Sequence, residues 1–540
     1  MRRAGPWLLL MGFHVVLMLL WHSQDTHLPD GDEAGQLGAI YLWWTSFPDK
    51  GVVQTLVDAF TGPGDYPPAF AVCYALLYAL LPVSAPFPTG LGVLLSLTSA
   101  CTLLVTGLLA QRLARGVGEA PVPMSAPLVS LLAVGSLGTA PLSAALARQA
   151  MPESFLALWV ALALWCGLSA QDFTRLRFCV GLGLALMMAG LTKQTMVLYL
   201  ALPLLLLGGL ALKRVGLRAL VGLSLTVLLA LPLPLLWLQL HWQEQVEYGT
   251  RSAEAKTTVP LWAELAYYPA GLVGEGLGLV WTPLFLLALG MLIRRRAWLP
   301  LLMWGLMLLA VLGVPKKYPR MLVPMMPLTA ALLAVGVGCV EPRRLRQGLV
   351  LGGLGLGTLQ HLTLSFSLPL PDKLGIWTPG LYHELDPDCA QEWIRRAQAE
   401  DPAFEGILSL YRESESVLGS EVLLVREPPV PCRYETTFGY AFHFSDFMRR
   451  HRHELSDVAV GEVNPDDFER QLPHARVVVS TRPWCDAQAG TQEEVGCGLR
   501  GAFVEAGVLE GRLGPAGATP EDLQFKLYLY RRVVPVERTP

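Results

Sequence analysis

Long runs of apolar residues fill the first two thirds of this 540-residue chain. A helix needs about 20 such residues to cross a bilayer, because backbone polar groups in hydrocarbon must bond within their own segment. We therefore expect an all-α polytopic membrane bundle of about 11 to 13 transmembrane helices. The runs cover residues 7–21, 90–110, 127–145, 152–169, 176–190, 194–211, 217–240, 278–293, 298–314, 321–340 and 347–366.

The character of the chain changes near Pro371. Residues 1–370 hold 23 Lys and Arg against 16 Asp and Glu, whereas residues 371–540 hold 18 against 28. We predict a transmembrane domain at 1–370 and a soluble α/β domain at 371–540. The tail has strand-like runs at 421–425, 475–480 and 523–530 and amphipathic stretches near 388–399 and 464–472.

Positive charge predicts the orientation of the bundle. Lys and Arg gather on alternate short loops, on the same side as Arg2 and Arg3, and such loops are cytoplasmic. The N-terminus is then cytoplasmic, while the loops at 22–89 and 241–277 and the tail are extracytoplasmic. The apolar run 66–81 is out of register with this pattern, so we expect it to re-enter or lie in the outer interface, with Tyr74 and Tyr78 as anchors.

Four cysteines lie in the tail, and an even number permits two disulfides in an oxidising compartment. Their connectivity is open. The candidates are Cys389, Cys432, Cys485 and Cys497.

Charged residues at four outer sites are explained neither by the positive-inside pattern nor by hydropathy. A carboxylate facing several cations at a membrane boundary suits an anionic, partly lipidic substrate, with Lys and Arg holding a phosphate and the carboxylate acting as general base. This suggests sugar transfer from a lipid phosphate, which needs one catalytic carboxylate because phosphate leaves without protonation. The sites are Asp30, Asp32 and Glu33; Arg148 and Glu153; Lys193; and Lys316, Lys317 and Arg320.

At these sites the chain resembles the GT-C membrane glycosyltransferases, in particular the branch of lipid A aminoarabinose transferases and protein O-mannosyltransferases. The resemblance covers most of residues 1–340. It implies an inverting hexosyl- or pentosyltransferase that uses a polyprenyl-phosphate-linked sugar. The motifs, in order, are the Asp-Glu pair at 32–33, Asp65-Tyr-Pro-Pro-Ala-Phe70, Arg148-x-x-x-Pro-Glu153, Leu-Thr-Lys193 and Lys317-Tyr-Pro-Arg-Met-Leu-Val-Pro-Met-Met-Pro327.

The resemblance also implies roles for single residues. Asp32 matches the catalytic loop carboxylate, with Glu33 beside it, and Glu153 matches the acid of the second outer loop, where Asp is commoner. Where bacterial relatives often place Lys before the double proline, this chain has Tyr66. The positions near the donor phosphate are Lys193, Lys317 and Arg320, to which we add Lys316, Arg148 and, on a lid-like loop, Arg251.

Simpler interpretations stay open for the same residues. Asp30 and Asp32 are good helix N-caps, although their Asp-x-Asp spacing and Glu153 also leave a divalent metal open. Arg148 and Glu153 could pair with each other, and Lys193 could extend towards solvent. The cations at 316–320 could bind lipid headgroups.

Two other functions compete with the transferase. A transporter or flippase of a lipid-linked anion would show repeat symmetry and polar groups at mid-membrane, and we find no repeat. A non-catalytic scaffold would make the outer charges dispensable. The acceptor could be a lipid, a glycan or a protein, and nucleic acid is not expected. Short loops favour a bacterial inner membrane.

Overall fold

The computed structural model describes two compact units, which we treat separately. The first comprises Met1–Gln24 and Ile40–Arg395, and the second Asp25–Ala39 and Arg396–Pro540. The residues described are 5–24, 31–62, 66–81, 87–116, 122–254, 261–314 and 318–366, together with five strands in the tail.

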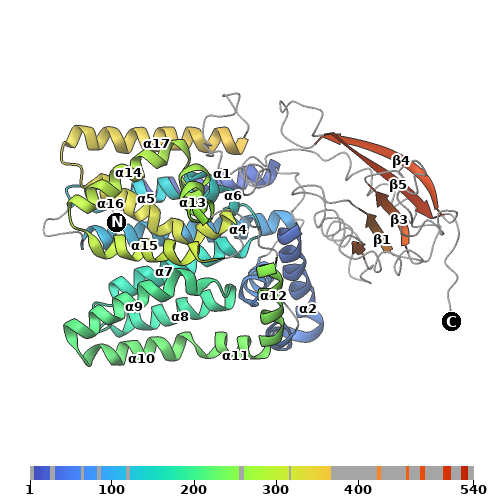
Figure 1. Cartoon of the computed structure of the whole chain (residues 1–540), viewed down its shortest axis with the longest axis horizontal. Helices are drawn as coiled ribbons and strands as arrows, with labels where there is room; N and C mark the ends of the chain where they lie inside the picture. Colours follow the sequence, from blue (N-terminus) through green and yellow to red (C-terminus); the bar gives the residue numbers. More distant parts are fainter. Residues whose placement is uncertain are drawn as a thin grey trace. The chain divides into compact units, whose positions relative to one another are not determined.

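The first unit, over its described residues, is a bundle of helices (Figure 1). They are α1 (Gly5–Gln24), α2 (Gly31–Thr61), α3 (Ala69–Leu80), α4 (Phe87–Ala114), α5 (Ala126–Thr139), α6 (Pro141–Ala147), α7 (Pro152–Ser169), α8 (Leu176–Thr192), α9 (Met196–Val215), α10 (Arg218–Ala230), α11 (Pro232–Leu240), α12 (Trp242–Glu254), α13 (Leu261–Gly271), η1 (Leu272–Gly276), α14 (Gly278–Arg294), α15 (Trp298–Leu312), η2 (Pro319–Met325), α16 (Met326–Gly338) and α17 (Arg343–Phe366). The first residues of α2 belong to the second unit.

Each of the eleven predicted apolar runs falls on a helix or on two consecutive helices. Within the described residues, six helices are long and apolar enough to cross a membrane, and eight if each of two bent pairs is one span. The bent pairs are α5 with α6, and α13 and η1 with α14. The protein is therefore an integral membrane protein, while the total of 11 to 13 spans stays a prediction.

Helix α16 is the centre of the bundle. It packs against α4, α5 and α14, and the 20-residue segment Pro319–Gly338 is wholly buried. A helix that is apolar on every side can be covered on every side. Small residues let its neighbours approach closely: a Cβ on Gly336 would lie 2.5 Å from the backbone oxygen of Ala288 on α14.

Helix α3 bears on two expectations for residues 66–81, namely that the segment does not span the membrane and that its two tyrosines are interfacial anchors. Its 12 residues span about 18 Å, less than the hydrocarbon core of a bilayer, so this helix alone does not cross. Tyr74 and Tyr78, however, are not interfacial anchors, because they are only 1% and 5% exposed. Tyr74 packs against Phe155 of α7 and donates a 2.7 Å hydrogen bond to Thr98 of α4, which ties α3 into the bundle.

The second unit contains a five-stranded mixed sheet in the order β2-β1-β3-β5-β4. Strand β1 runs parallel to β2 and β3, and β5 runs antiparallel to β3 and β4. The three predicted strands correspond to β1, β3 and β5. The amphipathic stretches near 388–399 and 464–472 lie outside the described residues. The strands are β1 (Val422–Arg426), β2 (Val458–Val460), β3 (Ala475–Ser480), β4 (Phe503–Arg512) and β5 (Gln524–Arg532).

Candidate functional site

Three of the predicted site residues meet where helices of the bundle end. Glu153 lies in the first turn of α7, after Pro152 at the first helical position. Lys193 is the C-cap of α8, where the backbone turns extended. Arg320 lies in η2, just before α16. Helix α7 packs against both α8 and η2, and this packing brings together residues far apart in sequence.

The three side chains form a buried ion cluster, which we call the Glu153 cluster. Lys193 Nζ lies 2.6 Å and Arg320 Nε 3.3 Å from the same oxygen, Glu153 Oε1. The residues are 1% (Glu153), 6% (Lys193) and 6% (Arg320) exposed. Two cations share one carboxylate, and the formal charges of these three side chains sum to +1 in a site largely closed to solvent. Lysine and arginine are the side chains that most often bind phosphate or carboxylate groups.

Aromatic rings flank both cations. Lys193 Nζ lies 5.1 Å from the ring centroid of Tyr66, and Arg320 Cζ lies 4.6 Å from that of Tyr318. Both distances are in the range of cation–π attraction, which holds a charged group in place without neutralising it. Tyr66, which precedes the double proline, thus lies beside Lys193.

Two tyrosines that sequence reasoning did not assign to the site hold the segment around Arg320. The Tyr199 hydroxyl of α9 donates a 2.8 Å hydrogen bond to the Met321 carbonyl, and the Tyr318 N–H donates a 3.4 Å bond to the Tyr268 hydroxyl. The only available signal for Tyr199 was a polar group inside an otherwise apolar run. Such a signal is weak, because a buried tyrosine needs a partner in any core.

Helix α12, in the predicted outer loop 241–277, is attached beside the cluster. The Gln194 amide, next to Lys193, donates a 2.5 Å hydrogen bond to Gln245 of α12. His241, which precedes α12, stacks on Trp237 and lies 2.8 Å from the Gly62 carbonyl after α2. This predicted loop is thus largely helical, and Arg251 lies on α12, although its side chain is not described.

The Glu153 cluster does not fit a divalent metal. Glu153 Oε1 already accepts from an ammonium and lies beside a guanidinium, so a metal bound there would face two positive charges. Within the described residues, no three His, Cys, Asp or Glu side chains form a metal-binding group. Asp30 lies outside those residues.

The other predicted residues are placed as follows. Arg148, the C-cap of α6, is buried with its guanidinium carbon 4.6 Å from the Trp21 ring of α1. Glu33 is buried and Asp32 lies in the first turn of α2, both in the second unit, and the side chain of Asp32 is not described. The residues that fall outside the described part of the chain are Lys316, Lys317, Cys389, Cys432, Cys485 and Cys497.

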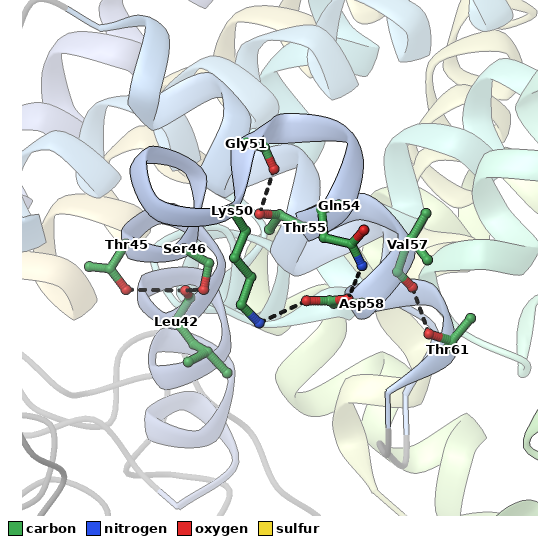
Figure 2. Close-up of polar contacts among 10 residues, drawn as sticks. All are labelled: Leu42, Thr45, Ser46, Lys50, Gly51, Gln54, Thr55, Val57, Asp58 and Thr61. Carbon is green, nitrogen blue, oxygen red and sulfur yellow. Dashed lines mark hydrogen bonds and ion pairs between the residues drawn. The ribbon is translucent and has the colours of Figure 1, made fainter.

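Helix α2 is kinked at Gly51, with φ 76° and ψ 159°, a conformation almost restricted to glycine. Figure 2 shows Lys50 at the end of the first arm reaching Asp58 on the second arm. Lys50 Nζ lies 2.7 Å from one oxygen of Asp58, and the Gln54 amide donates a 2.7 Å bond to the other. The Thr55 hydroxyl donates to the Gly51 carbonyl at 2.9 Å. The Lys50–Asp58 pair therefore joins the two arms across the kink, and the Gln54 amide fixes the Asp58 carboxylate for it.

The join across the kink is expected to weaken in acid. Hydrogen bonds from Lys50 and then Gln54 lower the pKa of Asp58, so the contact is complete above the ordinary pKa of an aspartate and is lost as pH falls through the lowered value. The pair is partly exposed, so its effect is local and small. Hydrogen exchange of the α2 amides should be faster in Asp58→Asn than in the unmodified protein at neutral pH, with the difference closing in acid. A difference that is independent of pH would contradict this.

Comparison with known proteins bears on the fold. No protein-family model matches the chain, and no curated protein matches its sequence. Among solved structures, ArnT from Cupriavidus metallidurans in the apo state superimposes with a TM-score of 0.55 at 15% identity, covering 97% of each chain. ArnT bound to undecaprenyl phosphate gives 0.56 at 15% identity, covering 97% of this chain and 98% of the other. ArnT, an aminoarabinose transferase, is a GT-C glycosyltransferase. The chain has the GT-C fold.

The GT-C fold confirms the structural side of the sequence resemblance. The two ArnT comparisons extend over nearly the whole of both chains. At 15% identity the likeness establishes the fold and leaves the activity to the chemistry of the site.

Proposed function

We propose that this protein is an inverting membrane glycosyltransferase that moves a sugar from a polyprenyl-phosphate donor to an acceptor on the outer side of the membrane. The observation that carries the proposal is the Glu153 cluster, in which two buried cations share one carboxylate where helices of the bundle end. A phosphate carried by a lipid is the anion that suits such a place in a membrane protein, because its headgroup is charged while its chain remains in hydrocarbon.

The proposed reaction divides the work between the cluster and the first outer loop. Lys193 and Arg320 bind the donor phosphate and stabilise the charge that develops on it as the sugar leaves. Asp32 accepts the proton of the acceptor hydroxyl or amine as that group attacks the anomeric carbon, with Glu33 beside it. Further contacts to phosphate are assigned to Lys316, Lys317, Arg148 and Arg251.

Two observations support this proposal over a transporter or flippase. The sequence shows no internal repeat of the kind from which many transporters are built. In addition, the GT-C protein ArnT, with the same fold, has a solved structure bound to undecaprenyl phosphate. A scaffold function would leave a buried, solvent-excluded charge cluster without a purpose.

The orientation and surroundings belong to the same proposal. The N-terminus is cytoplasmic, and the catalytic loop and the tail from 371 to 540 face outwards, in a bacterial inner membrane. The tail is an α/β domain, with disulfides formed among its four cysteines. The acceptor is a lipid, a glycan or a protein of the cell envelope.

Native mass spectrometry of the detergent-purified protein with added undecaprenyl phosphate tests the proposal. We expect a one-to-one adduct with the unmodified protein and at least a tenfold loss of affinity in Arg320→Gln, because one of the two buried cations of the cluster, both assigned to the phosphate, is removed. The fold should persist, since Glu153 remains paired with Lys193. Arg214→Gln, at an exposed arginine, is the matched control and should bind normally. Equal binding by Arg320→Gln, or no adduct with any protein, would overturn the proposal.

A further inference from the structure

Glu153 has a place in the cluster that the proposed reaction does not use. Its Oε1 atom is shared by Lys193 and Arg320, and the side chain is only 1% exposed. Its other oxygen, Oε2, is buried without a hydrogen-bond partner in the described part of the chain. A fixed carboxylate therefore lies against the two cations to which a phosphate would bind.

We infer that Glu153 sets the charge of phosphate that the site accepts, favouring the singly charged phosphodiester donor and disfavouring the doubly charged phosphomonoester product. The inference rests on the proposed function. It makes Glu153 a specificity-determining residue that acts through charge.

The charges of donor and product differ because of the reaction itself. An acceptor O–H attacks the anomeric carbon, the bond from that carbon to the phosphate oxygen breaks, and its electron pair stays on the phosphate. The acceptor proton passes to the base. The donor is a phosphodiester with one negative charge, and the product is a polyprenyl phosphomonoester with about −1.5 to −2 at neutral pH.

Glu153 acts unequally on these two charges. Its carboxylate is fixed between the two cations that would hold the phosphate, so it offsets part of their attraction for any anion. The product monoester carries up to one negative charge more than the donor, in a site where solvent screens little. Glu153 therefore repels the product more than the donor, which speeds release of the spent lipid and limits inhibition by it.

A series of variants separates charge from mere packing. Glu153→Gln raises the cluster to +2, the double variant Glu153→Gln with Lys193→Met returns it to +1, and Lys193→Met alone lowers it to 0. In Lys193→Met the remaining Glu153–Arg320 pair is neutral, so the fold should persist. The effect of charge on probe affinity can then be measured with this variant even if Glu153→Gln folds poorly. Any contribution from Lys316 and Lys317 is constant across the series.

The measurement is the dissociation constant of each protein for two probes, undecaprenyl phosphate and its methyl phosphodiester, at pH 8 where the first is doubly charged. The preference is the ratio of the affinity for the monoester to the affinity for the diester. We expect this ratio to rise roughly tenfold in Glu153→Gln, to return to the value of the unmodified protein in the double variant, and to fall below that value in Lys193→Met. A ratio that is constant across the series, or that fails to return in the double variant, overturns the inference. If no protein of the series binds either probe, the proposed function itself fails.

Discussion

Lys193→Met is expected to lower kcat/KM for sugar transfer by about 10²- to 10³-fold, the loss typical of removing one preorganised donor from a developing anion. The ammonium group is buried, lies 2.6 Å from Glu153 Oε1 and faces the Tyr66 ring, so its position is set before any ligand arrives. A methionine fills the same space without charge. The expected loss is larger in kcat than in KM, because the charge on phosphate grows as the sugar leaves.

The fold of Lys193→Met should survive, since Arg320 still pairs with Glu153. Removing both cations would instead leave a buried carboxylate unpaired, at a cost of about 3–5 kcal/mol. Lys213→Met, at an exposed lysine near the end of α9, is the matched control and should keep full activity. If Lys193→Met retained a rate within threefold of the unmodified enzyme, Lys193 would have no role in leaving-group stabilisation.

Asp32→Asn is expected to reduce transfer by about 10²- to 10⁴-fold, the range for loss of a general base. An amide has nearly the shape of a carboxylate but cannot accept the acceptor proton. Binding of the donor lipid should persist, because the cations assigned to the phosphate are unchanged. The measurements are kcat for transfer and the dissociation constant for undecaprenyl phosphate on the same preparation.

The control for Asp32→Asn is Asp49→Asn, the same substitution at an exposed aspartate of α2. It should leave both quantities unchanged. Glu33→Gln distinguishes the two neighbouring acids: if it abolished transfer while Asp32→Asn did not, the base would be Glu33. Near-normal turnover in both variants would remove the first outer loop from the chemistry.

The location of the helices was predictable because it depends on local composition. Each apolar run lies on a helix or on two consecutive helices, since a run without charges can satisfy its backbone only within itself in a membrane. The lengths of the individual helices were less predictable. The run 127–145 is broken into α5 and α6, which are bent by 69° near Pro141. The described parts of 241–277 form α12, α13 and η1 where only a loop was expected.

The members of the site were predictable, but their pairing was not. Glu153, Lys193 and Arg320 stand out in the sequence because charge is rare beside apolar runs. Sequence proximity suggested that Glu153 could pair with Arg148, five residues before it, and that Lys193 could extend towards solvent. The folded chain instead directs Lys193 inwards to Glu153 and adds Arg320 from 167 residues further along the sequence.

By itself, the sequence determined that this chain is a membrane bundle, which of its charges stand apart, and that it resembles GT-C enzymes. Hydropathy and charge are properties of single residues and short runs, so they are legible without a fold. Only the tertiary structure decided that one carboxylate serves two cations, that Tyr74 and Tyr78 are buried, and that Tyr199 holds the segment of Arg320. Contacts between helices depend on which faces meet, and that is a property of the packed bundle as a whole.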